Sequence, residues 1–279
     1  MTDFVVASGV ADVRSEPAAE SERVTQALLN MPVYAGELQG EWVPVKLVDY
    51  MGWMRLSDLA EPLQKSFCKI GESCMTPLPL IAVLSATHTQ LYAEAEDEQS
   101  LGPAYLSTWL PVLDTTHPAR VQVAVPGERT AWLERSAVEL RQRREPYPRQ
   151  SVETVLGYAR QFLGVEYLWG GTSWAGLDCS GFVQLCYRAG GYYIPRDGDQ
   201  QDGFLYHAIE RPQMRAGDLI FFGSQEITHV ALALNYHEYI HAEGQLYNRV
   251  TINSFRSTEE HYYPRLDEIV WSIKRVVEE

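Results

Sequence analysis

Residues 177–191 have the sequence LDCSGFVQLCYRAGG, which combines a cysteine with features that can activate it. Cys179 follows Asp178 and precedes an amphipathic run that ends at two glycines, which predicts a helix capped by Asp178. A cysteine attacks as the thiolate, and the free N–H groups at a helix N-terminus lower its pKa. Asp178 acts in the opposite direction, because a nearby carboxylate raises a thiol pKa. A nucleophilic Cys179 therefore needs a strong base close by.

Two histidines further along the chain can supply that base. His229 opens a predicted strand at 229–235, and His241 lies within a predicted strand at 238–244. If these strands form a hairpin, the two side chains meet on adjacent strands. A nucleophile, a base and a third group that orients the base make up a catalytic triad, and a histidine can fill the third place. Each residue alone has a structural explanation as a packed side chain, but the three together indicate nucleophilic catalysis.

The elements around these residues predict an α+β domain. A Ser151 cap and apolar residues at positions 152, 155, 156, 159, 162 and 163 predict a helix before the cysteine. The helix after Asp178 is expected to bury Phe182, Val183, Cys186 and Ala189. Besides the two histidine strands, we expect strands at 218–223 and 269–277. Helices followed by a series of antiparallel strands are typical of an α+β fold.

The first half of the chain contains a diverged repeat with an offset of about 78 residues. MPVYAGELQGEWVPV (31–45) matches LPVLDTTHPARVQV (110–123), and GWMRLSDL (52–59) matches AWLERSAV (131–138). Short alternating strands with turns between them predict a small β-barrel in each copy. The charged, proline-containing segment at 141–150 then predicts a boundary. We expect three domains, at 1–64, 65–145 and 146–279.

Composition excludes several classes of partner. The net charge of −14 disfavours nucleic acid and anionic membranes, because both need clustered basic residues. The N-terminus lacks a signal pattern and no apolar run is long enough to span a bilayer, so we expect a cytoplasmic protein. Cys68 and Cys74 lack the spacing of a zinc site, and no metal or disulfide is expected.

The second half resembles the NlpC/p60 family of cysteine peptidases, which have a reduced papain-like fold. The motifs that carry the resemblance lie in order over roughly 150–279 and are YLWGGTSWAGLDCSGFVQLCY, IPRDGDQQ, RAGDLIFFG, ITHVALAL and YIHAEG. The resemblance implies that Cys179 is the nucleophile, His229 the base and His241 the orienting residue. It also implies that Tyr167 and the Cys179 N–H hold the oxyanion. No metal or organic cofactor is implied.

Together these observations predict two small all-β SH3-like barrels followed by an α+β papain-like (NlpC/p60) domain. This arrangement is similar to the murein-peptide recycling endopeptidases, which cut between γ-D-glutamate and an L-diamino acid. The implied partner is a murein tripeptide or tetrapeptide, and a barrel that closes one end of the cleft would admit only peptides with a free N-terminal L-Ala.

The resemblance also implies a set of substrate-binding residues. In the peptidase domain these are Asp178, Ser180, Trp169, Arg196 and Asp197. In the first barrel Tyr50 and Glu22 are candidates for the amine pocket, with Glu16 as the alternative to Glu22. Gly198 stands where the family carries a serine, so one hydroxyl contact is missing, and water, Gln200 or Ser180 could replace it.

Three alternative functions stay open at this point. The same fold could serve a cysteine amidase or acyltransferase. The chain could be a secreted peptidoglycan hydrolase, or a binding protein whose barrels hold wall peptides. The identity of the diamino acid (diaminopimelate or lysine), the length of the accepted peptide and the oligomeric state are also open.

Overall fold

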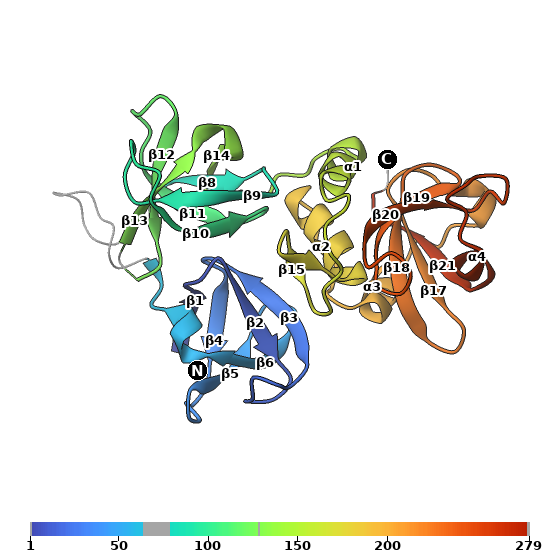
Figure 1. Ribbon diagram of the computed structural model, residues 1–279, viewed down its shortest axis with the longest axis horizontal. Coiled ribbons are helices and arrows are strands. Elements are labelled where there is room, and N and C mark those ends of the chain that lie inside the picture. Colours follow the sequence, from blue (N-terminus) through green and yellow to red (C-terminus); the bar gives the residue numbers. More distant parts are fainter. Residues whose placement is uncertain (1, 64–78, 128, 278–279) are drawn as a thin grey trace. The chain divides into compact units, whose positions relative to one another are not determined.

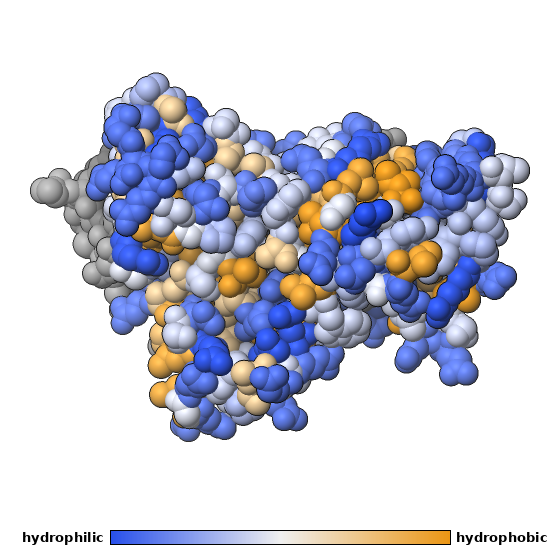
Figure 2. Space-filling view, viewed as in Figure 1, coloured by the Kyte–Doolittle hydropathy of each residue, from blue (hydrophilic) through white to orange (hydrophobic). Residues whose placement is uncertain are grey.

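A computed structural model describes residues 2–63, 79–127 and 129–277 (Figure 1). The chain divides into two compact units, Met1–Pro146 and Tyr147–Glu279. Cys68 and Cys74 lie outside the described residues. None of the helices in the described ranges has the length and hydropathy needed to cross a bilayer. Hydrophilic residues cover most of the surface in Figure 2, in keeping with the high net charge, and hydrophobic residues form smaller groups between them.

The first unit begins with a seven-stranded antiparallel sheet in the order β3-β2-β6-β5-β4-β1-β7. Its short strands alternate inward and outward side chains, as β2 does, and the inward residues Val13, Val33, Val45 and Met54 share one core. The strands are β1 Thr2–Val6, β2 Val10–Arg14, β3 Arg23–Leu28, β4 Pro32–Ala35, β5 Trp42–Lys46, β6 Met51–Arg55 and β7 Leu59–Ala60, and a 3-10 turn, η1, covers Leu56–Asp58.

The second sheet of this unit repeats the first, in the order β10-β9-β13-β12-β11-β8-β14. Each strand has the place of the strand seven positions earlier, and the core residues Val13 and Leu91, and Val45 and Val123, lie 78 positions apart. The strands are β8 Leu80–Leu84, β9 His88–Tyr92, β10 Ser100–Tyr105, β11 Trp109–Asp114, β12 Arg120–Val125, β13 Arg129–Glu134 and β14 Val138–Gln142, with the turn η3 at Arg135–Ala137. The internal repeat in the sequence is therefore a repeat of the fold.

The second unit combines helices with a five-stranded antiparallel sheet in the order β20-β19-β18-β17-β21. Helix α2 packs against α1 and against β18 and β19. The elements are α1 Val152–Gln161, β15 Thr172–Ser173, β16 Gly176–Leu177, α2 Cys179–Ala189, α3 Gly198–Phe204, η4 Arg211–Gln213, β17 Asp218–Gly223, β18 Ile227–Ala233, β19 Glu238–Glu243, β20 Arg249–Ser254, α4 Pro264–Glu268 and β21 Val270–Arg275. The predicted fold class is confirmed.

Most of the predicted elements of this unit are present, with local differences. Ser151 caps α1 by accepting from the Thr154 N–H at 3.2 Å, as its sequence predicted. The extension of the predicted helix to Leu163 was wrong: the helix ends at Gln161, and Leu163 is 45% exposed. Gly164 follows with a φ of +83°, which turns the chain away from the helix. Strand β20 and helices α3 and α4 were not predicted.

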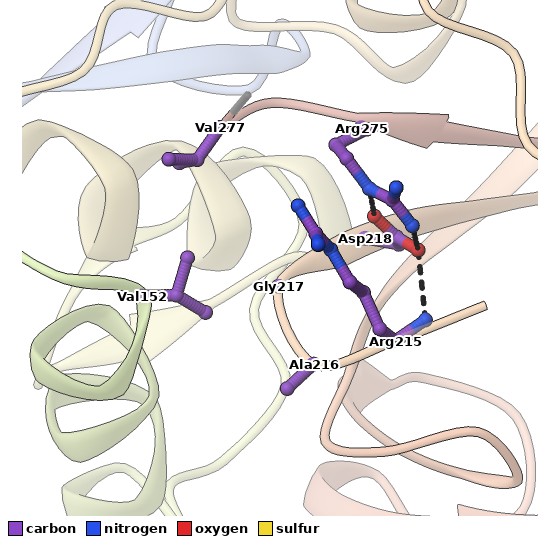
Figure 3. A pocket seen from close by; sticks show the side chains of 7 residues that line it. All are labelled: Val152, Arg215, Ala216, Gly217, Asp218, Arg275 and Val277. Atoms are coloured by element: carbon purple, nitrogen blue, oxygen red, sulfur yellow. Dashed lines mark hydrogen bonds and ion pairs between the residues drawn. The ribbon is translucent and has the colours of Figure 1, made fainter. Parts of the chain in front are cut away.

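A buried ion pair joins two strands of the second unit. Asp218 at the start of β17 is 1% exposed, and Arg275 of β21 donates to its two oxygens at 2.8 and 2.9 Å (Figure 3). The Arg215 N–H donates to the same carboxylate at 2.8 Å. Because both charges are paired and the carboxylate is further hydrogen-bonded, this pair can remain buried and hold β21 in register.

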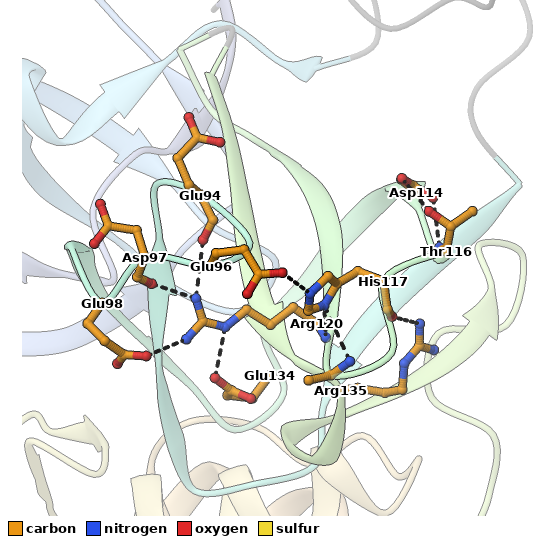
Figure 4. A network of polar contacts seen from close by, with 11 residues as sticks. Glu94, Glu96, Asp97, Glu98, Asp114, Thr116, His117, Arg120, Glu134 and Arg135 are labelled. Carbon is orange, nitrogen blue, oxygen red and sulfur yellow. Dashed lines mark hydrogen bonds and ion pairs between the residues drawn. The ribbon is translucent and has the colours of Figure 1, made fainter.

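A buried arginine has a similar role in the second barrel. Arg120 of β12 donates to Glu134 and Glu98, each at 3.0 Å (Figure 4). It also donates to the carbonyls of Glu94 and Asp97, at 3.2 and 2.6 Å. One side chain thus fixes the loop between β9 and β10 to the neighbouring strands.

Candidate active site

Cys179 is the first residue of α2, as predicted from its sequence. Asp178 has extended backbone angles and caps the helix by accepting from the Gly181 N–H at 2.7 Å. The N–H of Cys179 therefore has no partner within the helix and can donate elsewhere. Cys179 is half-buried, whereas Cys186 on the same helix is fully buried. The assignment of Cys186 to the core is confirmed.

The thiol lies against the strand that carries the predicted base. The backbone N–H groups of Val230 and Ser180 donate toward its sulfur. Val230 directly follows His229 in β18, and α2 packs on this strand. The helix N-terminus and the histidine strand therefore meet at Cys179.

His229 and His241 form the first link of a hydrogen-bonded relay. His229 Nε2 lies 2.6 Å from His241 Nδ1, across the pair of strands β18 and β19. His241 Nε2 lies 2.9 Å from Asn253 Oδ1, and Asn253 Nδ2 donates to the His261 carbonyl at 2.8 Å. The relay therefore continues past the two predicted histidines to Asn253 on β20 and ends on the main chain.

The end of the relay determines the tautomer of both histidines. A carbonyl only accepts, so the Asn253 amide nitrogen must face His261 and its oxygen must face His241. His241 then donates from Nε2, and in the neutral ring its Nδ1 accepts from His229. His229 therefore carries its proton on Nε2 and has the lone pair of Nδ1 available as a base.

Asn253 was not identified from the sequence. It lies in the segment RVTINS, which was not assigned as a strand. An asparagine inside an otherwise β-forming run was the available signal, because asparagine is depleted in strands unless its amide has partners.

The environment favours the neutral forms of both reacting groups. Burial, and then the Asp178 carboxylate, raise the pKa of the Cys179 thiol to about 12 against the opposing N–H donors. Burial, and then the neighbouring His241, hold the pKa of His229 well below its usual range. Burial lowers the pKa of His241 to about 4, although its bond to Asn253 acts in the opposite direction. Both shifts favour a thiol and a neutral imidazole over an ion pair.

Tyr167 stays protonated and is held beside the cysteine. Burial, and then negative charge at Cys179 and Asp178, raise the pKa of its hydroxyl. A Cβ added at Gly244 would come within 2.7 Å of the Tyr167 ring, so only glycine permits this contact. The Tyr167 N–H donates to the Asn248 carbonyl at 3.0 Å, which fixes the backbone. A protonated hydroxyl at this place can donate to a developing oxyanion.

Three of the predicted substrate-binding residues form a buried network behind the cysteine. Arg196 is 2% exposed and contacts Asp178 Oδ2 at 2.5 Å and Ser180 Oγ at 2.8 Å. Asp178 Oδ2 also accepts from the Gly170 N–H at 2.9 Å. These contacts show that the network fixes the start of α2; contact with substrate stays a prediction for all three.

Asp197 and Gly198 lie at the start of α3. Asp197 is the N-cap residue, 4.0 Å from Arg196, and Gly198 is the first residue of the helix. Gln200, one candidate for replacing the missing serine hydroxyl, donates to Asp197 at 3.3 Å. A Cβ at Gly198 would meet only the Ile227 side chain, at an ordinary 3.5 Å. The fold therefore has room for a side chain at position 198.

A cavity of about 270 Å³ opens beside the base. Tyr167, Trp169 and His229 line one part of it, and Trp169 is 60% exposed. The other lining residues come from β18, the end of β19 and the loop after it, and α4 with its flanks: Thr228, Glu243, Gly244, Gln245, Tyr263, Arg265, Leu266 and Ile269.

The remaining candidates lie in the first unit. Tyr50 is half-buried and packs on the core of the first barrel, and Glu22 and Glu16 are exposed. Their part in an amine pocket stays a prediction.

One group of residues in the described ranges has the spacing of metal ligands. The ligand atoms of His237, Glu238 and Glu259 lie within 4.8 Å of one another. His237 pairs with Glu259 at 3.3 Å, and His261 pairs with Glu238 at 3.2 Å. These contacts already join the histidines of the group to its glutamates.

Comparison with known proteins identifies the family. Residues 164–268 match the NlpC/P60 family, and residues 13–59 match the bacterial dipeptidyl-peptidase Sh3 domain. A gamma-D-glutamyl-L-lysine dipeptidyl-peptidase of Bacillus subtilis is 30% identical over 78% of this chain and 71% of its own length. The chain belongs to the NlpC/P60 family of cysteine peptidases.

Other relatives of this NlpC/P60 protein agree in sequence and fold. Dipeptidyl-peptidase 6 of Lysinibacillus sphaericus is 29% identical over 94% of both chains. A gamma-D-glutamyl-L-lysine dipeptidyl-peptidase of Bacillus cereus is 30% identical over 78% of this chain and 66% of its own length. The crystal structure of an NlpC/P60 family protein from Bacillus cereus superimposes with a TM-score of 0.84 over 99% of this chain and all of that one, at 21% identity. That structure supports the fold.

Proposed function

We propose that this NlpC/P60 protein is a cysteine endopeptidase that hydrolyses the γ-D-glutamyl–L-diamino acid bond of free murein peptides with an unblocked N-terminal L-Ala. The observation that carries the proposal is the meeting of Cys179, at a helix start, with a neutral histidine relay whose free nitrogen is a base. The names of the relatives, two γ-D-glutamyl-L-lysine dipeptidyl-peptidases and a dipeptidyl-peptidase 6, support the substrate class.

In the first half of the reaction, the Cys179 sulfur attacks the carbonyl carbon of the γ-amide. His229 Nδ1 takes the thiol proton in the same step, because the resting pair is neutral. The Cys179 N–H and the Tyr167 hydroxyl stabilise the oxyanion. The protonated His229 then donates to the departing amine, and a thioester remains.

In the second half, water attacks the thioester with His229 as the base. The products are L-Ala-γ-D-Glu and the restored thiol. His241 and Asn253 touch neither substrate nor leaving group; they hold the His229 ring in the tautomer that presents Nδ1.

We further propose that the substrate is a freed peptide in the cytoplasm, as in cell-wall recycling. The net charge of −14 supports this, because it opposes adsorption to polyanionic wall polymers but does not prevent binding of a small peptide.

The test is mass spectrometry of L-Ala-γ-D-Glu-L-Lys and its diaminopimelate equivalent, each with a free and an acetylated amino terminus. Release of L-Ala-γ-D-Glu from the free peptides alone is expected, with no release by Cys179→Ala. Cleavage of the acetylated peptides as well would remove the amine requirement. Cleavage of none would direct attention to amidase or acyltransferase chemistry.

A further inference from the structure

The cavity beside His229 contains two charged residues that the proposed mechanism does not use. Glu243 ends β19, and Arg265 lies in α4. His229 and Tyr167, which act on the scissile bond, line the same cavity. The cavity therefore adjoins the reacting atoms and also includes residues of α4.

The position of His229 indicates which part of the substrate enters this cavity. After attack by Cys179, His229 must deliver its proton to the leaving nitrogen, so that nitrogen comes within hydrogen-bond reach of the ring. The residue attached to it, the diamino acid, then continues along the wall that carries His229. On the proposed function, the cavity holds the leaving group.

Arg265 is a cation with a fixed place and, in the part of the chain that the structure describes, no acidic partner. Its guanidinium donates to Gln245 Oε1 at 2.8 Å, and within the described ranges it pairs with no carboxylate. Helix α4 is fixed just after Arg265, because Leu266 is buried and Asp267 pairs with Arg211. An arginine without a carboxylate at the wall of a cavity is notable in a chain with a net charge of −14.

Glu243 lines the same cavity but forms no ion pair with Arg265, because its carboxylate oxygens accept from backbone N–H groups instead. It is 4% exposed and accepts from the backbone N–H groups of residues 245, 246 and 247 at 2.8, 2.7 and 2.7 Å. These bonds shape the loop that carries Gln245, and Gln245 in turn orients Arg265. Glu243 is thus a positioning residue, and Arg265 is the group that faces a ligand.

We infer that Arg265 binds a carboxylate of the leaving diamino acid and so determines specificity on this side of the bond. Arginine matches carboxylates in geometry as well as charge. Tyr263 and Ile269 give the same cavity apolar walls against which the methylene chain of the diamino acid can pack. Two carboxylates have this chemistry: the main-chain carboxylate of a C-terminal diamino acid and the side-chain carboxylate of diaminopimelate.

Four peptides show which of the two carboxylates Arg265 binds. They are L-Ala-γ-D-Glu followed by lysine or diaminopimelate, each with its main-chain carboxylate free or as an amide. The lysine amide lacks both carboxylates. We expect the wild-type kcat/KM to be about tenfold to a hundredfold lower for the lysine amide than for the preferred peptide. If the main-chain carboxylate is bound, both amides are poor substrates. If the side-chain carboxylate is bound, the diaminopimelate amide stays good and both lysine peptides are poor.

In Arg265→Gln the four peptides are expected to be cleaved with similar kcat/KM. The matched control is Arg160→Gln, which removes an exposed arginine of α1 outside the cavity and should keep the wild-type preference. Equal cleavage of all four peptides by the wild type, or a preference retained in Arg265→Gln, would overturn the inference.

Calorimetric binding to Cys179→Ala separates this inference from the proposed function. Tighter binding of the carboxylate-bearing peptides, lost in the Cys179→Ala/Arg265→Gln double variant, supports the role of Arg265 whatever the turnover. Absence of cleavage by the wild type despite such binding would contradict the proposed function alone. Equal binding of all four peptides would contradict the role of Arg265 alone.

Discussion

At the residue scale, the site is a set of neutral groups whose protons are placed by hydrogen bonding. The sequence was sufficient to identify Cys179, His229 and His241 as candidates, because each type has a distinct chemistry and the helix cap marked the cysteine. It could not identify the tautomer of His229, since that depends on the direction of the Asn253 amide two strands away.

The pH profile follows from the two displaced pKa values. For activity, Cys179 and His229 must together hold one proton, either on the sulfur or shared between the sulfur and the imidazole ring. Because the pKa of His229 is lowered, the base stays neutral below its ordinary pKa of 6.5, and activity is lost only as pH falls further. Because the thiol pKa is raised, the alkaline limit lies above its ordinary 9.0. We expect kcat/KM for the tripeptide to be flat between these values; an acid limb centred above pH 6.5 would contradict this assignment.

Replacement of Asn253 tests the relay. Asn253→Ala removes the acceptor of His241 and should lower kcat/KM by roughly 10²-fold, because the base loses its fixed tautomer. Asn253→Asp keeps an acceptor but adds a negative charge, which favours the protonated histidines and raises their pKa. The acid limb of kcat/KM should therefore move to higher pH in Asn253→Asp. An unchanged limb together with full activity in both variants would exclude Asn253 from the relay.

At the element scale, the predicted parts are those with a local signal. Caps and apolar periodicity predicted α1 and α2, and β-forming runs predicted four strands. Helix α4 is only five residues long, so its local pattern is weak, and β20 is a β-forming run that contains Asn253 near its end. These two elements supply Asn253 and, on the further inference, Arg265.

Two glycines near the site make a matched comparison. Gly198→Ser adds a side chain where there is room and should change the free energy of unfolding by less than about 1 kcal/mol. Gly244→Ala places a Cβ against the Tyr167 ring and should lower kcat by up to about 10²-fold through a displaced oxyanion donor. Thermal unfolding and kcat of both variants check this. A normal kcat in Gly244→Ala would argue against Tyr167 as that donor.

At the scale of the whole molecule, the repeat was the most informative feature of the sequence. Turn residues and alternating strands recur at one offset, so two small barrels could be predicted without knowledge of their packing. The structure gives both the same strand order. The hypothesis that the first barrel takes part in substrate binding cannot be tested by such a pattern, because no local pattern encodes contacts between domains.

A variant of the first barrel tests that hypothesis. Tyr50→Ala is expected to raise KM for the free tripeptide by about tenfold, as for loss of one hydrogen bond to a charged amine. Thermal unfolding of the full chain serves as the control for stability, because Tyr50 also packs on the barrel core. Unchanged kinetics would leave Tyr50 with a structural role alone.

The relay of His229, His241 and Asn253 has an electrostatic consequence. Many triads end in a carboxylate, which keeps an anion next to the reacting atoms. Here the relay ends on a peptide carbonyl, and Asp178 is matched by Arg196, so neither adds an unpaired anion next to the thiol. The carboxylate nearest the base is Glu243, which lies in the cavity beside His229 and is held by backbone N–H groups. A peptide substrate with several carboxylates therefore meets no carboxylate of the relay itself when it approaches the thiol.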